Sequence, residues 1–539
     1  MSIKFRWCAI AAALLCSGVG SAQGVYAQIS QPTVISFSDA AAPTPAPSTA
    51  QAGQVIYSDP GATIYSEAVP SDSAYPEPTP MAPSQWTYVE PSAAPAAAPS
   101  KDKPKPAGAA KSHKGVFYAN DFSYLSDPTT GSYFGDSLKQ LKVGRGTLDI
   151  GGQLRHRYHS ESGQGRQAGA AGFQDTQNDF SLYRARLYAN WQINDRVRVF
   201  AEGIYADVVA NDEFLPRAID RNRGDFLNLF VDFKLNRLNT NVRIGRQELL
   251  LGDQRLASPL DWANTRRTFE GIRTTTKVND WTLDAFYTEF VPVTFDEFDD
   301  SDSDRIFYGA YANYGGFKNA TADLYYIGFK NDNAGAINAN FDLHTLGTRL
   351  NGKTQRNLLY DFESAIQFGD QDGLNQDHEA YFVTAGLGYK FKDLPWSPTL
   401  WGYYDFASGN DPNDGDFNRF NDLFPLGHKY LGFIDAVARS NIQSPNARLT
   451  LQPTQKTKLL LWYYYFEADQ VSDVIPGVAV PANQDLTNDD FGNELDLVLS
   501  HQLTPRTNVT FGYSHFWRGD RIIGTNDADF FYLQTTLNF

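Results

Sequence analysis

Apolar and polar residues alternate with a period of two along most of the chain from about residue 116 onward. In the segment 182–193, Leu187 and Trp191 fall on one side, whereas Arg184 and Arg186 fall on the other. Strict alternation indicates β-strands with one apolar and one polar face. The same pattern recurs in segments 197–208, 226–235, 241–249, 281–290, 357–368, 381–391, 399–409, 446–452, 457–469, 493–503, 507–517 and 529–539.

A soluble β-sandwich would show the same alternation, but three features favour a membrane barrel. Short turns at 194–195, 279–280 and 504–505 recur with longer polar loops, as in outer-membrane barrels. Aromatic residues make up 14% of the chain and gather at strand ends, which suits interfacial girdles. The third feature is an N-terminal secretion signal.

Residues 1–27 predict that signal peptide, with Lys4 and Arg6 before an apolar run and cleavage after Ala22 or Ala27. Cys16 raises the alternative of a lipoprotein, which the bulky residue before it disfavours. Cys8 and Cys16 are the only cysteines in the sequence, so the mature chain is expected to contain no disulfide.

Residues 28–115 are rich in Pro, Ala and Ser, which predicts a disordered linker that cannot bury enough apolar surface to fold. Its basic end (101–114) is either a solvated tether or a contact to an anionic surface such as the cell wall. Residues 116–539 are then expected to form an all-β, antiparallel up-and-down barrel of about 16 to 18 strands, which is wide enough for an aqueous lumen.

The last strand ends on Phe539, with Leu537, Leu533 and Phe531 on the same face. A terminal aromatic residue after alternating apolar residues resembles the signal that the bacterial outer-membrane assembly machinery reads. We therefore expect outer-membrane lipids, lipopolysaccharide and this machinery as partners.

The chain carries a formal net charge of -16, yet six arginines lie between Asn241 and Arg273. More arginines fall on polar strand faces, which point into the lumen of a barrel. A guanidinium offers five donors and binds carboxylates well, so these side chains are candidates for an anion path. The alternative is that they pair with lumen carboxylates and hold the wall together. The candidates on polar faces are Arg155, Arg157, Arg184, Arg186, Arg198, Arg243, Arg349 and Arg448.

Arg246 is in phase with the lipid-facing residues Val242 and Ile244, and a lipid-facing arginine costs about 2–4 kcal/mol at the membrane midplane. We therefore predict a register break at Gly245 that turns Arg246 inward. Arg273 opens the next strand, and the link between the two strands, with Arg255, Arg266 and Arg267, is expected to fold into the pore mouth.

Carboxylates on polar faces are either selectivity elements or ordinary cross-strand partners of the arginines. They are Glu202, Asp284, Asp361, Glu363, Asp405, Glu494 and Asp496, and Asp253 joins them as a residue beside the constriction. Acidic loops at 296–304, 370–377 and 411–416 give at most a weak surface calcium site, because none has a complete calcium-loop pattern. We expect no cofactor, no bound metal and no nucleic-acid partner.

A barrel-embedded phospholipase is the relevant enzyme alternative, with Ser514, His501 and His515 as the candidate catalytic residues. Both histidines fall on the apolar face of their strands, and Ser514 points away from His515. We therefore predict that the chain is not an enzyme.

Several blocks resemble the alginate export family of outer-membrane proteins. They are FSLYRARLYANWQI (180–193), GRQELLLGDQRL (245–256), DWANTRRTFEGIR (261–273), FPLGHKYLGFIDAVARSNIQ (424–443) and GNELDLVLSHQL (492–503). The resemblance implies an 18-stranded barrel with an arginine-lined constriction for an acidic polysaccharide. It carries Arg184, Arg186, Arg246 and Arg273 over to the anion path, whereas the Pro-rich tail departs from the family.

The resulting hypothesis is a passive outer-membrane channel for an anionic polysaccharide such as alginate, or for a related anionic solute. One alternative is a general or small-anion uptake porin. Another is a structural barrel that anchors the cell envelope, with the tail bound to peptidoglycan or to periplasmic secretion partners.

Overall fold

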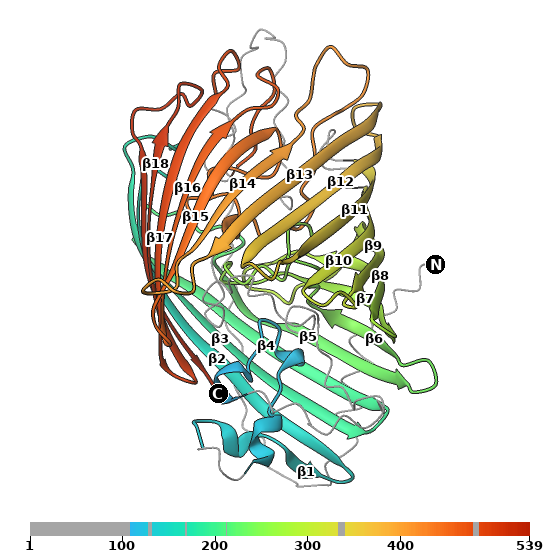
Figure 1. The fold of residues 1–539 in the computed structure, drawn as a ribbon. Coiled ribbons are helices and arrows are strands. Elements are labelled where there is room, and N and C mark those ends of the chain that lie inside the picture. The colour runs from blue at the N-terminus through green and yellow to red at the C-terminus, as the bar shows by residue number, and fades with distance from the viewer. Residues whose placement is uncertain (1–107, 128–131, 168–169, 212, 333–339, 478–483) are drawn as a thin grey trace, which may run out of the picture.

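The computed structural model describes residues 108–539 except 128–131, 168–169, 212, 333–339 and 478–483. Its wall is a closed, antiparallel barrel of the 18 strands β2 to β19, in which each strand pairs with the next one along the chain (Figure 1). The ring closes where β19 pairs with β2, from Asn538 opposite Gln153 to Asp529 opposite Ser162. The predicted fold class and strand number are therefore confirmed.

The strands are β1 Leu141–Val143, β2 Gly146–Ser162, β3 Gln177–Asn194, β4 Val197–Ala210, β5 Asn222–Leu235, β6 Thr240–Gln247, β7 Thr268–Val278, β8 Trp281–Val291, β9 Asp302–Tyr314, β10 Ala320–Asn331, β11 Phe341–Lys353, β12 Leu358–Gln371, β13 Gln376–Lys390, β14 Thr399–Ala407, β15 Ile442–Thr454, β16 Thr457–Glu467, β17 Asp490–Thr504, β18 Thr507–Arg518 and β19 Ala528–Asn538. The helices are short 3-10 turns, namely η1 Ala109–Lys111, η2 Phe117–Ala119, η3 Ser123–Ser126, η4 Asp136–Leu138 and η5 Gly427–Lys429. None of the helices in the described part of the chain has the length and apolarity needed to cross a bilayer.

The alternation in the sequence sets which side of the wall each residue occupies. On β2 and β3, Leu154 and Leu187 are 50% and 58% exposed on the outside, whereas Arg155 and Arg186 are buried on the inside. This is the distribution expected of a barrel that presents its apolar face to lipid.

Short turns join strands at one end of the barrel, and the long loops lie at the other end. Two long loops, 248–267 between β6 and β7 and 408–441 between β14 and β15, pack inside the barrel. Their apolar side chains, including Leu251, Trp262 and Phe424, belong to one core with wall residues. Ala257 and Phe424 pair as an isolated bridge between the two loops.

Residues 108–126, which we call the plug segment, precede the wall and enter the barrel at the end with the short turns. Arg506, in the β17–β18 turn, donates to the Ala109 carbonyl at 3.1 Å. Further in, the ring of Tyr118 packs edge-on against Phe200 and Phe230 of the wall. The wall therefore begins at Gly146, thirty residues after the predicted boundary at Val116, and the end of the predicted linker (108–115) belongs to this segment. Most of that linker, and the signal peptide, lie outside the described residues.

The predicted register break at Gly245 is wrong. The ladders of β6 with β5 and β7 run through Gly245 in continuous register. Gly245 instead adopts φ +126°, a conformation that favours glycine, and Arg246 is buried against carboxylates. The nearest register irregularities lie one strand away, in the β4–β5 ladder.

Two of the predicted acidic loops are partly strand. The segment 296–304 runs into β9, and 370–377 covers the ends of β12 and β13. The described residues contain no group of three or more His, Cys, Asp or Glu side chains that could hold a metal ion.

Candidate anion path in the barrel lumen

All ten arginines predicted to line a pore are buried, as are seven of the eight predicted carboxylates. The exception, Asp253, has a side chain that is 21% exposed. Seven of the ten arginines contact a carboxylate, so the structure brings the two predicted sets together as ion pairs. The contacts of Arg155, Arg157 and Arg448 in the described structure are to carbonyls, amide oxygens, hydroxyls or rings instead.

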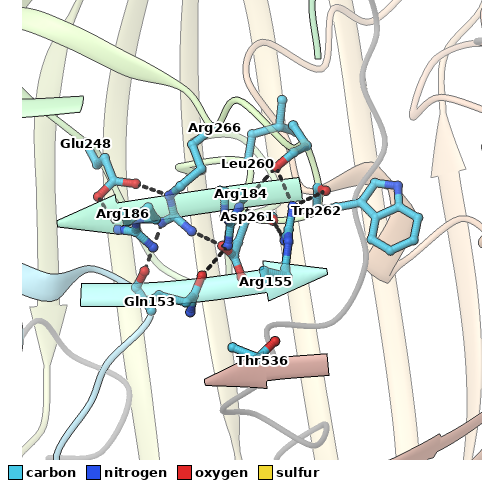
Figure 2. A network of polar contacts seen from close by, with 12 residues as sticks. Gln153, Arg155, Arg184, Arg186, Glu248, Leu260, Asp261, Trp262, Arg266 and Thr536 are labelled. Atoms are coloured by element: carbon cyan, nitrogen blue, oxygen red, sulfur yellow. Dashed lines mark hydrogen bonds and ion pairs between the residues drawn. The ribbon is translucent and has the colours of Figure 1, made fainter. Parts of the chain in front are cut away.

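The first cluster joins β2, β3 and β4 to the β6–β7 loop (Figure 2). Arg186 donates to Glu202 at 2.6 Å, and Arg184 donates to Asp261 at 2.7 Å. Arg266 bridges Asp261 and Glu248. Arg155, directly opposite Arg184 in the ladder, donates to the Asp261 carbonyl at 2.6 Å.

Four arginines (155, 184, 186 and 266) thus share three carboxylates (202, 248 and 261) in this cluster. Burial alone would raise the pKa of Asp261, but Arg184, Arg266 and Arg155 outweigh it and hold that pKa below its usual range. Asp261 therefore stays ionised, and the cluster holds four guanidinium groups against three carboxyl groups.

The second cluster joins the opposite wall to both lumen loops. Arg255 reaches from the β6–β7 loop to Asp361 at 2.8 Å and Glu363 at 2.6 Å on β12. Arg349 of β11 contacts Asp361 at 3.0 Å and Asp253 at 3.2 Å. Lys429 of the β14–β15 loop completes the cluster at 3.0 Å from Asp253, whose pKa these cations lower against the effect of burial. This cluster crosses the lumen from wall to loop.

The third cluster meets the plug segment. Arg243 and Arg198 each bond Asp232, with their Nε atoms 2.8 Å from it. Arg198 also donates to the Tyr118 carbonyl at 3.0 Å, and the Arg243 guanidinium lies 4.2 Å from the Tyr118 ring centre. The plug segment therefore covers cations that were predicted to face the anion path.

The remaining predicted residues are distributed around the wall. Arg273 pairs with Asp284 at 2.8 Å, and Arg246 pairs with Asp225 at 3.1 Å and Glu270 at 3.2 Å. Asp405 accepts from Arg439 at 2.7 Å.

Two sets of lumen residues, on β15 and β17, differ from these ion pairs. Arg448 lies among the rings of Trp401, Tyr403 and Trp462. Glu494 accepts from the Ile434 backbone at 2.8 Å, and Asp496 lies two residues further along β17.

Sequence reasoning missed several partners that complete these clusters. Glu248, Asp261 and Lys429 lie in loops, where no strand period assigns a side. Asp232 was in phase with the polar face of β5 but was not singled out. The signal available for Asp261 was its position at the start of the DWANTRR block.

The residues of the enzyme alternative do not assemble. Ser514 is buried opposite Asp496 in the β17–β18 ladder, whereas His515 contacts Asp529 at 2.8 Å and His501 contacts Thr457 at 2.9 Å. That the chain lacks catalytic activity stays a prediction.

A closed 18-stranded barrel with a polar, charged interior defines the class of outer-membrane channel. The sequence profile of the family described as alginate export matches residues 147–534, so the chain belongs to the alginate export family. The predicted family and the predicted location in the bacterial outer membrane are thereby confirmed.

Solved structures of outer-membrane channels share the fold. OccK8 (OprE) of Pseudomonas aeruginosa is 14% identical, with 73% of this chain and 98% of that chain covered and a TM-score of 0.51. OpdK of Pseudomonas aeruginosa, in its structure with vanillate, is 12% identical, with 72% and 98% covered and a TM-score of 0.51. No curated protein is detectably similar to this chain.

Proposed function

We propose that the chain is a passive channel for anionic solutes, with an acidic polysaccharide of the alginate type as the first candidate. The observation that carries this proposal is the distribution of charge. A protein with net charge -16 places ten predicted arginines inside its barrel, from β2 around to β15, together with loop cations such as Arg255 and Arg266. Membership of the alginate export family supports the same substrate class.

In this proposal, a uronate polymer passes by exchanging partners. Each carboxylate of the polymer competes with a lumen carboxylate such as Glu202 or Asp261 for a guanidinium. The lumen acids keep each binding step weak, which a conducting pore requires because the substrate has to leave again.

In the described conformation the β6–β7 loop covers Arg155 and Arg184, and the plug segment covers Arg198. The β14–β15 loop bonds Arg267 of the β6–β7 loop. Conduction of a polymer therefore requires these three segments to move aside, whereas the wall needs no change. This makes the described conformation the closed state of the proposed channel.

A small-anion porin is the second candidate. The fold relative OpdK was solved with vanillate, a single aromatic carboxylate, and a solute of that size needs less loop movement than a polymer. A structural barrel that anchors the envelope through its tail is the third hypothesis, and it predicts no current.

The test is ion conductance of the purified full-length protein in planar bilayers. Anion-selective current that polyuronate blocks supports the polysaccharide channel. Current that is insensitive to polyuronate but blocked by small carboxylates supports the small-anion porin. An absence of current under all conditions, with correctly folded barrels, would overturn both.

A further inference from the structure

Beside Arg157 lies a small pocket that the ion-pair clusters do not account for. It is enclosed by β2, by the β2–β3 and β4–β5 loops, and by Trp262 and Asp435 of the two lumen loops. Because β2 runs from the short-turn end toward the long-loop end, the pocket lies on the outer side of the first arginine cluster. A solute that enters from outside meets it first.

Five polar side chains that line this pocket carry buried atoms without a hydrogen-bond partner in the described structure. These atoms are Nε and Nη1 of Arg157, Nε2 of His159, Oε2 of Glu161, Nε2 of Gln164 and Nε of Arg166. Buried polar groups are normally paired, because an unpaired one costs about 1–3 kcal/mol. The five side chains around this pocket therefore offer several donors and one acceptor to a polar ligand.

The pocket also carries ionisable groups of both signs. Arg157, Arg166 and Arg217 line it, against Glu161, Asp220 and Asp435. Arg166 bonds both Asp220 and Glu161.

Burial raises the pKa of Asp435 well above its usual range, although Arg217 opposes the shift. A protonated Asp435 also fits its 2.7 Å contact with Nδ1 of His428, whose own pKa burial lowers. With Asp435 protonated, Glu161 and Asp220 are the carboxyl groups left to face three guanidinium groups, and burying an uncompensated charge is costly.

Arg157 makes no ion pair in the described structure, and its position is fixed. Its Nη2 donates to the Trp262 carbonyl at 2.8 Å, and its guanidinium carbon lies 3.2 Å from the centre of the Trp262 ring. The side chain is 2% exposed. A donor held in place this way binds an anion without losing further side-chain entropy.

We propose that this pocket binds a single small hydroxycarboxylate, with the carboxylate on Arg157 and Gln164 and the hydroxyl donating to Glu161. The donors and the acceptor are both needed in this assignment, because an anion alone would leave Oε2 of Glu161 unpaired. The inference rests on the proposed function and deepens it, since one unit of a sugar acid carries this same pair of groups.

The test is a titration of the full-length protein in detergent with glycolate, the smallest hydroxycarboxylate, followed by tryptophan fluorescence. The fluorescence of Trp262 should respond directly to a ligand in the pocket, because the Arg157 guanidinium stacks on its ring. We expect a saturable change with glycolate, about tenfold weaker binding of acetate, which lacks the hydroxyl, and no binding of the neutral glycolamide. Trp262→Phe should remove the signal, which assigns it to this pocket.

Arg157→Met removes the charge at similar size and should abolish the glycolate response, whereas Arg157→Lys should retain a weaker one. Arg223→Met is the matched control, because Arg223 is an exposed arginine paired with Asp207 outside the pocket, and its response should equal that of the natural protein. Heat-modifiable migration on gels shows whether each variant is folded.

An unchanged glycolate response in folded Arg157→Met, or equal binding of glycolamide, would overturn the site. Saturable glycolate binding without ionic current would support the site and contradict the transport proposal. Anion current without saturable glycolate binding would support the transport proposal and contradict the site.

Discussion

At the scale of single residues, the lumen places like charges directly opposite each other. Arg155 faces Arg184 across β2 and β3, and Arg243 faces Arg273 across β6 and β7. Such pairs are normally destabilising. Here each arginine turns to a different acceptor, a loop carbonyl or carboxylate in the first pair and Asp232 or Asp284 in the second. The wall thus depends on its loops for charge balance.

Two substitutions in the first cluster should change the ion selectivity in opposite directions. Glu202→Gln removes an anion from the cluster and Arg184→Gln removes a cation, at closely similar size. We expect the anion-to-cation permeability ratio to rise in the first variant and to fall in the second, by about two- to fivefold each. That range corresponds to roughly 0.4–1 kcal/mol for one charge near solvated ions.

Zero-current potentials in a salt gradient measure this ratio. Arg223→Gln, which removes an exposed cation at the start of β5, is the control and should leave it near the natural value. Shifts of the same sign in both cluster variants would mean that loosened packing, rather than charge, sets selectivity.

His113 gives a pH prediction for the plug segment. Burial, with Arg506 and Lys139 adding to it, lowers the pKa of His113 from 6.5 to about 3, while the Phe539 backbone and Asp136 oppose the shift. Because the docked state has the lower pKa, docking is fully stable above pH 6.5 and weakens as pH falls toward 3. At pH 5.5 the docking equilibrium should fall about tenfold, at 1.36 kcal/mol per pKa unit.

Protease protection of the plug segment at pH 7.5 and 5.5 measures this change. His113→Gln retains an acceptor for Arg506 but cannot titrate in this range, so its protection should not respond to pH. Lys139, whose pKa burial lowers to about 8, is mainly charged at both pH values. An equal response in the glutamine variant would assign the effect to another group.

The sequence predicted the position of a side chain only within strands, where alternation assigns each residue to one face of the wall. Arg184 and Glu202 were placed inside because their neighbours alternate. Their partners Asp261 and Glu248 were not, because a loop has no period and its path through the lumen depends on contacts far along the chain. Arg246 shows the limit most clearly, since its phase pointed outward and ion pairs with Asp225 and Glu270 settle its position.

At the scale of elements, the plug segment closes the end of the barrel with the short turns, which in outer-membrane barrels faces the periplasm. Phe117 lies 3.8 Å from the Arg186 guanidinium, and the Tyr118 hydroxyl donates to the Glu248 carbonyl at 2.9 Å. Arg266 donates to the Gly115 carbonyl at 2.8 Å. One short segment therefore contacts both the wall arginines and the β6–β7 loop, so its release should affect both.

A reversible crosslink tests whether this segment gates the channel. Tyr118 and Phe230 have ring centres 5.6 Å apart, one on the segment and one on β5. In Tyr118→Cys/Phe230→Cys, a short bifunctional thiol reagent that contains a disulfide can span the gap left by the two rings. It should hold the segment in place and reduce conductance about tenfold or more relative to the reduced protein. The mature chain is expected to be free of other cysteines, because Cys8 and Cys16 lie in the predicted signal peptide.

Conductance of one preparation before and after a reducing agent is the measurement. The single variants Tyr118→Cys and Phe230→Cys are the controls and should not respond. Equal conductance of the crosslinked and reduced double variant would show that ions do not pass where the segment lies.

Strands were the elements that the sequence predicted best. The predicted segment 197–208 corresponds to β4 and 507–517 to β18, with ends within two residues. The plug segment was assigned partly to the linker and partly to the barrel, because 3-10 turns stabilised by Arg198 and Arg506 leave no periodic pattern of their own.

At the scale of the whole molecule, the barrel is held by closure between its first and last wall strands. Phe539 extends this seam beyond β19, since its amide and carbonyl both pair with Gly152, at 2.9 and 2.8 Å. Closure was predictable because the expected strand number is even and because a membrane barrel cannot leave a strand edge unpaired. The filling of the lumen was not, because it depends on where the loops at 248–267 and 408–441 fold.

Phe539 separates the stability of the barrel from its assembly. Phe539→Ala keeps both backbone bonds to Gly152, so protein refolded in detergent should form the heat-modifiable barrel normally. If the assembly machinery reads the terminal aromatic residue, the same variant should reach the outer membrane several-fold less. The ring also packs on Phe134 at 5.9 Å, so Phe134→Ala is the matched control that removes this contact and leaves the terminal signal intact. Equal loss in both variants, or a refolding defect in Phe539→Ala, would assign the role of Phe539 to packing, whereas a loss confined to the membrane fraction of Phe539→Ala assigns it to recognition during assembly.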